Sequence, residues 1–198
     1  MIYLASRSPR RRELLAQIGV RYSLLLFRSR PESREEVNED PLPGEAPAVY
    51  VERVARAKAD SGWRRMMQRN LPQAPVLAAD TTVALGERIL GKPASREEAA
   101  AMLAELSDSQ HQVLTAIALK YGDWMESALS RSEVRFKKLT PEEIRQYVAT
   151  RECDDKAGGY AIQGRAARFI TELRGSYSGV MGLPLYETAQ LLERRNTP

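Results

Sequence analysis

Serine and arginine residues lie where the sequence predicts the start of a helix. Ser8 has the residue type of an N-cap and Pro9 that of a first helical position, and apolar residues follow at helical spacing. Arg10 and Arg11 then fall in the first turn, where the helix dipole disfavours cations. Hydroxyls, free N–H groups and arginines at one helix start suit a bound anion, and a solvated basic turn is the alternative. Without an anion, removal of Arg11 is expected to be neutral or slightly stabilising.

An acidic residue, Asp80, directly follows the continuous apolar run 76–79, which predicts a buried strand that ends on this carboxylate. Lys58 ends a predicted helix over 50–58, and Lys92 follows a predicted hairpin. Phosphoryl chemistry uses such a set, because cations neutralise phosphate oxygens while an aspartate holds Mg²⁺ or takes a proton from water. The alternative for Asp80 is an aspartate that only caps a helix or stabilises a turn.

Other catalytic sets are missing from the sequence. The single histidine, His111, lies in a polar stretch and is expected to be structural or solvent-facing rather than a base. Cys153 stands beside two aspartates, which disfavour the thiolate. The GKP sequence at 91–93 lacks the spacing of a P-loop, so a P-loop NTPase is disfavoured.

A length of 198 residues allows one sizeable α/β domain or two small lobes, and 43% of the residues are hydrophobic, which predicts a packed core. We expect a single domain over residues 1–198. One cysteine excludes an internal disulfide and a cysteine-based zinc site. A formal charge of +4 is too small to argue for non-specific nucleic-acid binding. No apolar run reaches the length of a membrane span and no signal peptide is recognisable. We therefore expect a cytoplasmic protein with no membrane or nucleic-acid partner.

Patterns along the chain predict strands and helices of an α/β fold. Two capping boxes, Ser95 with Glu98 and Thr140 with Glu143, mark helix starts. The segment 28–47 is polar and broken by prolines, which predicts a long functional loop. The predicted strands cover 2–5, 22–27, 76–79, the hairpin 82–90, 112–121, 126–136 and 168–173.

Several motifs in combination resemble the Maf family of nucleotide pyrophosphatases, which is related in fold to the inosine-triphosphate pyrophosphatases. They are LASRSPRRRELL at 4–15, ERVARAKA at 52–59, AADTTV at 78–83, GKP at 91–93, LSDSQHQVLTAIAL at 106–119, DKAGGYAIQG at 155–164 and GLPL at 182–185. The resemblance covers nearly the whole chain. It implies an elongated, twisted mixed sheet flanked by helices, with a central cleft between two lobes.

The loop DKAGGYAIQG, with Lys156 and Gln163, is similar to that of the subgroup that hydrolyses dTTP and UTP. The subgroup acting on 7-methyl-GTP carries a different loop there. The resemblance therefore implies hydrolysis of a pyrimidine nucleoside triphosphate between the α and β phosphates, and it leaves open whether modified pyrimidine nucleotides are also substrates. The neutral amide of Gln163 suits the O4 and N3–H edge of uracil or thymine.

The resemblance also implies roles for individual residues. Asp80 is expected to accept a proton from water, alone or through Mg²⁺ or Mn²⁺. Glu32 is the nearest match in this chain to a second metal-binding carboxylate, although Arg30 and Pro31 break the usual pattern. The expected substrate-binding residues are Ser8, Arg10, Arg11, Lys58, Thr81, Lys92, Lys156 and Gln163.

Two other functions remain open. The Maf resemblance also allows a nucleotide-binding regulator of cell division, or septum formation, with weak catalysis. An RNA-binding module could use the basic face of 7–12, but that face lacks interleaved aromatic residues for base stacking. Release of pyrophosphate from UTP would distinguish a nucleotide pyrophosphatase from the regulator and from the RNA-binding module. A homodimer is compatible with the sequence, which carries no signal for or against one.

Overall fold

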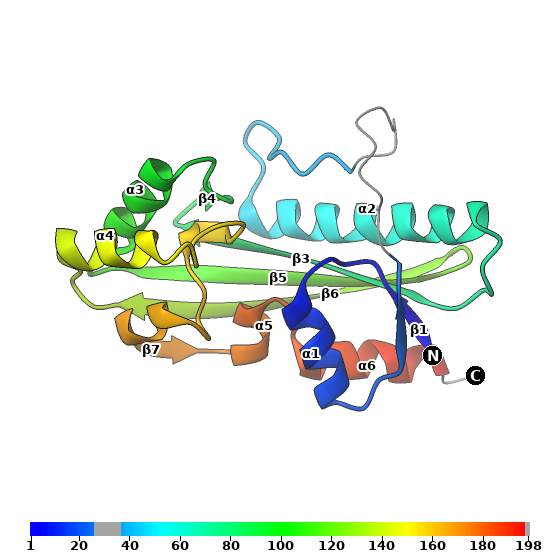
Figure 1. Ribbon diagram of the computed structural model, residues 1–198. Coiled ribbons are helices and arrows are strands. Elements are labelled where there is room, and N and C mark those ends of the chain that lie inside the picture. The colour runs from blue at the N-terminus through cyan, green and yellow to red at the C-terminus, as the bar shows by residue number, and fades with distance from the viewer. Residues whose placement is uncertain (26–36, 197–198) are drawn as a thin grey trace.

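The computed structural model describes residues 1–25 and 37–196, and one mixed sheet runs through its length (Figure 1). The strands are β1 (Ile2–Leu4), β2 (Tyr22–Leu24), β3 (Val76–Leu85), β4 (Arg88–Leu90), β5 (Gln110–Tyr121), β6 (Trp124–Phe136) and β7 (Ile170–Arg174). The helices are α1 (Pro9–Gln17), α2 (Pro47–Gln68), α3 (Arg96–Leu106), α4 (Pro141–Ala149), α5 (Tyr177–Met181) and α6 (Leu185–Asn196), with 3₁₀ turns η1 (Ala157–Gly159) and η2 (Arg165–Phe169).

The sheet has the order β2-β1-β3-β5-β6-β7, with β4 paired to β3. Strand β1 lies parallel to β2 and β3, whereas the remaining pairs are antiparallel. The predicted pair of long strands is confirmed, because β5 and β6 form a hairpin that turns at Gly122, a residue with a φ of 58°. These long strands give the molecule its elongated shape in Figure 1, so the predicted elongated mixed sheet is confirmed.

Helices cover both faces of the sheet (Figure 1). Helix α2 packs its apolar side, including Val51, Val54 and Ala55, on one face. Helices α1 and α6 cover the opposite face through Leu14, Leu15 and Leu191. Helices α3 and α4 enclose a third apolar cluster at the open end of the long hairpin, where β5 begins and β6 ends. The cavity described below is lined by residues of two of these clusters, among them Ala5 and Val83.

Two predicted boundaries are wrong, and both concern site residues. Helix α2 continues ten residues beyond Lys58 to Gln68, because Ala59, Gly62 and Met66 prolong its buried face. Strand β3 continues beyond Asp80 to Leu85, since β-branched residues follow the acid and pair with β4 and β5. Lys58 and Asp80 therefore lie within long elements rather than at their ends.

Smaller differences also occur. Thr140 and Glu143 form the predicted capping box. Ser95 accepts a hydrogen bond from the Glu98 N–H, but the Glu98 carboxylate accepts from Ala94 instead of completing the box. The last strand begins at Ile170, after a 3₁₀ turn, and β2 ends at Leu24, beyond which residues 26–36 are not described. Within the described chain, no helix is long and apolar enough to cross a membrane.

Candidate active site

A gap along one edge of β3 explains how a mid-strand acid can reach a cavity. On this edge β1 pairs only with Val76 and Leu77, and β4 pairs only from Val83 onward. Within the described chain, no strand covers residues 78–82 between them. Asp80 and Thr81 lie in this gap and point to opposite faces of the sheet, so both can line one cavity that passes through it.

The cavity has a volume of about 670 Å³ and lies where the loop after β1, helix α2 and the segment after α4 meet. It is lined by every predicted site residue that the structure describes: Ser8, Arg10, Arg11, Lys58, Asp80, Thr81, Lys92, Lys156 and Gln163. These residues are far apart in the sequence, and the fold brings them together. Glu32, the predicted second metal ligand, lies outside the described residues.

An ion-pair cluster of alternating charges occupies the middle of the cavity. Lys58 donates to Asp80 at 2.8 Å and to Glu39 at 2.9 Å, while Lys92 lies 3.7 Å from the same Glu39 oxygen. Partial burial opposes the charged form of Glu39, but the attraction of the two lysines lowers the pKa of this carboxyl overall. Two carboxylates that share one ammonium group can also approach a small divalent cation.

Glu39 is a candidate site residue that the sequence analysis missed. Helix α2 holds its backbone, because the Tyr50 hydroxyl donates to the Glu39 carbonyl at 2.8 Å and Arg53 donates to the flanking carbonyls of Asn38 and Asp40. Arg53 also pairs with Glu45 at 2.6 Å, and this pairing lowers the pKa of Glu45 to about 2. The available signal was the acidic pair Glu39 and Asp40 directly before the proline-rich turn at 41–44.

The contacts of Arg11 overturn the expectation that it lacks a partner in the empty protein. Its guanidinium donates to the Gly182 carbonyl at 2.7 Å, to the Ser6 hydroxyl at 3.2 Å and to the Thr81 hydroxyl at 3.4 Å. Burial lowers the pKa of Arg11, and nearby Asp80 opposes that shift. Arg11 therefore joins three segments of the cavity wall as well as supplying positive charge.

Thr81 is held in a chain of hydroxyl groups. The hydroxyls of Thr81 and Thr115 lie 2.9 Å apart, and the buried Thr115 hydroxyl donates to the Gly179 carbonyl at 2.7 Å. A hydroxyl has one hydrogen, so Thr115 accepts from Thr81 while it donates to Gly179. Thr81 thus donates to Thr115 and accepts from Arg11, and these two contacts fix the orientation of its hydroxyl.

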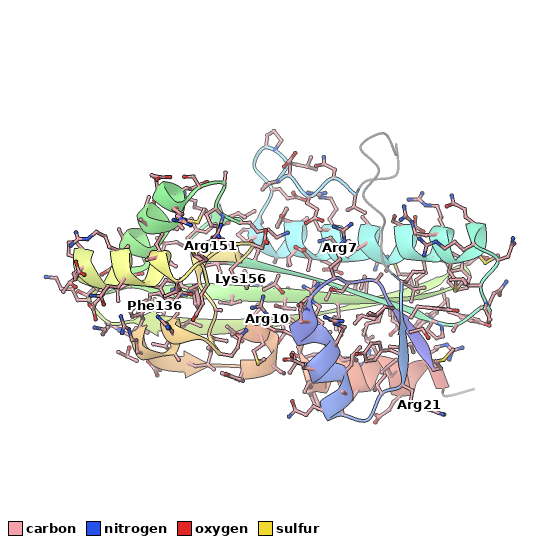
Figure 2. The ribbon with its side chains drawn as sticks, in the orientation of Figure 1. Arg7, Arg10, Arg21, Phe136, Arg151 and Lys156 are labelled. Carbon is pink, nitrogen blue, oxygen red and sulfur yellow. The ribbon has the colours of Figure 1, made fainter. Side chains whose placement is uncertain are left out.

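Arg10 and Lys156 form a second cationic group near each other (Figure 2). Burial lowers the pKa of both side chains, and Arg10 lowers the pKa of Lys156 further by repulsion. Lys156 donates to the Asp154 carbonyl at 2.9 Å, whereas Arg10 makes no side-chain hydrogen bond or ion pair with another described residue. An anion between them would relieve the repulsion.

Ser8 occupies the N-cap position of α1, but its side chain makes no capping hydrogen bond. The Ser8 N–H instead donates to the Ser6 hydroxyl at 3.2 Å. Helix α1 has no acidic residue in its first turn. The positive end of this helix is therefore directed at the cavity with uncapped N–H groups, as the sequence predicts for an anion site.

His111 and Cys153 do not line the cavity. The expectation that His111 could face solvent is wrong, because the residue lies in β5 with 2% of its surface exposed. Burial lowers the pKa of His111 to about 4, which supports its predicted structural role. Cys153 is buried, and burial raises the pKa of its thiol.

This geometry can perform a limited range of chemistry. Lysine, arginine and helix N–H groups can neutralise several phosphate oxygens, and Asp80 can accept a proton. Among the described residues, no three histidine, cysteine, aspartate or glutamate side chains gather as a protein-only metal site. Asp80 and Glu39 supply two carboxylates, which fits Mg²⁺ because this ion often combines one or two carboxylates with substrate phosphates.

The fold and the cavity define an α/β protein whose cleft gathers cations around a pair of carboxylates. The structure of the Staphylococcus aureus Ham1 protein has a similar architecture, with a TM-score of 0.54 over 98% of both chains at 13% sequence identity. The family model described as Maf-like protein matches residues 1–195. The chain belongs to this family.

Three relatives extend this relationship over the full length. A protein of Aromatoleum aromaticum is 58% identical over 198 residues, covering 100% of this chain and 96% of the relative. A protein of Nitrosomonas europaea is 55% identical, covering 97% and 93%, and one of Dechloromonas aromatica is 53% identical, covering 98% and 96%. All three relatives are named dTTP/UTP pyrophosphatase.

Proposed function

We propose that this chain hydrolyses dTTP and UTP to the corresponding monophosphate and pyrophosphate. The observation that carries the proposal is one cavity lined by the acid Asp80, by the cations Lys58, Lys92, Arg10 and Arg11, and by Gln163. Relatives at 53–58% identity over the full chain bear the name of this activity, which supports the same assignment.

In the proposed reaction, the triphosphate lies among Arg10, Arg11, Lys58 and Lys92, with Ser8 at the start of α1. Asp80 takes the proton of the attacking water, and the α–β phosphoanhydride bond breaks. The cations stabilise the charge that develops on the departing pyrophosphate. Lys58 must exchange its carboxylate contacts for phosphate contacts, because it donates to both Asp80 and Glu39 in the empty cavity.

Mg²⁺ or Mn²⁺ is a further part of this proposal. Asp80 and Glu39 would hold the ion, and Glu39 takes the role that the sequence analysis gave to Glu32. Such an ion supplies charge neutralisation of phosphate oxygens and lowers the pKa of bound water. Omission of divalent cations, followed by separate addition of Mg²⁺ and Mn²⁺, tests the requirement.

A screen of nucleoside triphosphates tests the function. Purified protein with Mg²⁺ is incubated with UTP, dTTP, CTP, ATP and GTP, and pyrophosphate and monophosphate are both measured. We expect the highest kcat/KM for UTP and dTTP, with equal amounts of the two products. Release of inorganic phosphate without pyrophosphate would contradict the proposed bond cleavage. The alternative of a cell-division regulator predicts nucleotide binding with little turnover of any substrate.

A further inference from the structure

The cavity wall has an apolar part as well as cationic groups. Val83, Val113 and Tyr160 line the cavity and belong to one buried cluster, against which Val180 packs. The phosphate groups of a nucleotide would bind among the cations, so this apolar part of the wall is where a base can pack. This inference rests on the proposed function, since it assigns the base end of the proposed nucleotide site.

The segment 157–163 contributes Tyr160, Ile162 and Gln163 to the cavity wall, and hydrogen bonds join it to three other parts of the fold. The Gly158 N–H donates to the Gly91 carbonyl at 3.0 Å, beside Lys92. The Ala161 N–H donates to the buried Tyr147 hydroxyl at 3.2 Å. Gln163 itself makes no side-chain hydrogen bond with another described residue. Its position therefore depends on how firmly the segment is held.

The third contact that holds the segment joins two buried side chains, His111 and Tyr160. His111 Nε2 lies 2.8 Å from the Tyr160 hydroxyl, and the two residues expose 2% and 6% of their surfaces. Both rings pack edge-on against Phe136, with centroid distances of 5.0 Å for His111 and 4.9 Å for Tyr160. His111 thus holds the hydroxyl of Tyr160, a residue that lines the cavity.

The imidazole at this position is more polar than packing requires. His111 Nδ1 is buried and has no hydrogen-bond partner in the described chain. A buried polar atom without a partner is unfavourable, and a phenyl ring would fill the same apolar cluster without one. The contact with Tyr160 is the feature of His111 that a phenyl ring would lose.

We propose that His111 is a positioning residue for base recognition, which holds Tyr160 from behind and so fixes the wall and segment against which the nucleotide base binds. His111 takes no part in phosphate binding or proton transfer. Replacement of His111 should weaken the binding of ligands that have a base. It should leave the binding of ligands that consist of phosphate alone unchanged.

The test compares His111→Phe/Tyr160→Phe with wild type. Replacing both polar partners by apolar rings of similar shape leaves no unpaired polar group, so the variant is expected to fold. His111→Gln retains a side chain that can bond the Tyr160 hydroxyl and serves as the conservative rescue. Tyr3→Phe, at a buried tyrosine that does not line the cavity, is the matched control.

Two binding measurements and one kinetic measurement give the result. Calorimetry with a non-hydrolysable UTP analogue should show binding weakened about tenfold in the double variant, the size expected for one lost hydrogen bond. Inorganic tripolyphosphate should bind as in wild type. The KM for UTP should rise with little change in kcat, and the ratio of kcat/KM for GTP to that for UTP should increase. His111→Gln should lie closer to wild type on each measure.

Unchanged affinity for the UTP analogue in a folded double variant would overturn the inference. An equal loss of affinity for tripolyphosphate would also overturn it, because it would show a general structural role. Failure of wild type to release pyrophosphate from any nucleotide would instead count against the proposed function. Binding of the two probes does not depend on turnover, so the two failures are distinguishable.

Discussion

At the residue scale, Asp80 is the group on which turnover should depend most. Asp80→Asn keeps the shape of the side chain but removes its ability to accept a proton, so we expect kcat to fall about 10²–10⁴-fold. Circular dichroism should show an unchanged fold. Asp60→Asn, on α2 and outside the cavity, is the matched control and should retain wild-type kcat. A rate above a tenth of wild type in Asp80→Asn would exclude Asp80 as the base.

The two arginines in the first turn of α1 should differ in their effects on stability. Arg11→Ala leaves the Gly182 carbonyl and the Thr81 hydroxyl without their donor, so the free energy of unfolding should fall by about 1–3 kcal/mol. Arg10→Ala removes no such bond and should change it by less than about 0.5 kcal/mol. Urea unfolding of the ligand-free proteins measures both. Equal losses would show that Arg10 also has a structural partner.

Gln163 should determine the choice of base. Glutamate cannot donate to O4 of uracil or thymine, so Gln163→Glu should lower kcat/KM for UTP and dTTP by the equivalent of about 1–3 kcal/mol. Activity on a guanine nucleotide should suffer less, because a carboxylate can accept from N1–H and the amino group. Steady-state kinetics on the three substrates decides the matter. The same proportional loss on all of them would mean that Gln163 does not contact the base.

At the scale of elements, the segment 157–163 is sensitive to one backbone position. Gly158 has a φ of 67°, and an added Cβ would lie 2.9 Å from a Val83 methyl group. Gly122 has a similar φ of 58° but nothing within 4 Å. Gly122→Ala should cost about 1 kcal/mol from backbone strain alone, and Gly158→Ala should cost more and also raise the KM for UTP. Equal stabilities of the two variants and an unchanged KM would show that the Val83 side chain moves aside without cost.

Sequence patterns predicted which elements exist better than where they end. The two stretches 112–121 and 126–136 were sufficient to predict the β5–β6 hairpin, because both strands and the turn at Gly122 that joins them are neighbours in the sequence. The pattern failed at Lys58 and Asp80, since polar residues inside long elements look like boundaries when the cavity that surrounds them is unknown. Glu39 was missed for a related reason. Its position depends on contacts with Tyr50 and Arg53, which no periodicity within 28–47 reveals.

At the scale of the whole molecule, the single histidine gives stability a defined pH dependence. Burial lowers the pKa of His111 from 6.5 to about 4, so between these values the unfolded chain binds a proton that the folded protein does not. The free energy of unfolding should therefore rise with pH from about 4 to 6.5, by at most about 1.4 kcal/mol per unit, and level off above. His111→Phe should lose the contribution of the histidine and keep only that of carboxyls such as Glu45, as urea unfolding across the range would show. Parallel curves for the two proteins would mean that His111 keeps its ordinary pKa in the fold.

The gap between β1 and β4 has a consequence for amide hydrogen exchange. Pro75 and Leu77 direct their carbonyls towards β1, and residues two apart face the same edge, so the Thr81 N–H faces the gap. This amide should exchange with deuterium faster than those of Val76 and Val83, although all three belong to one central strand. A ligand that fills the cavity should slow exchange at Thr81 and at Ala79, whose N–H faces the same gap two residues earlier, and not at Val76 or Val83. These two backbone amides would then report occupancy of the site, independently of turnover and of any side chain.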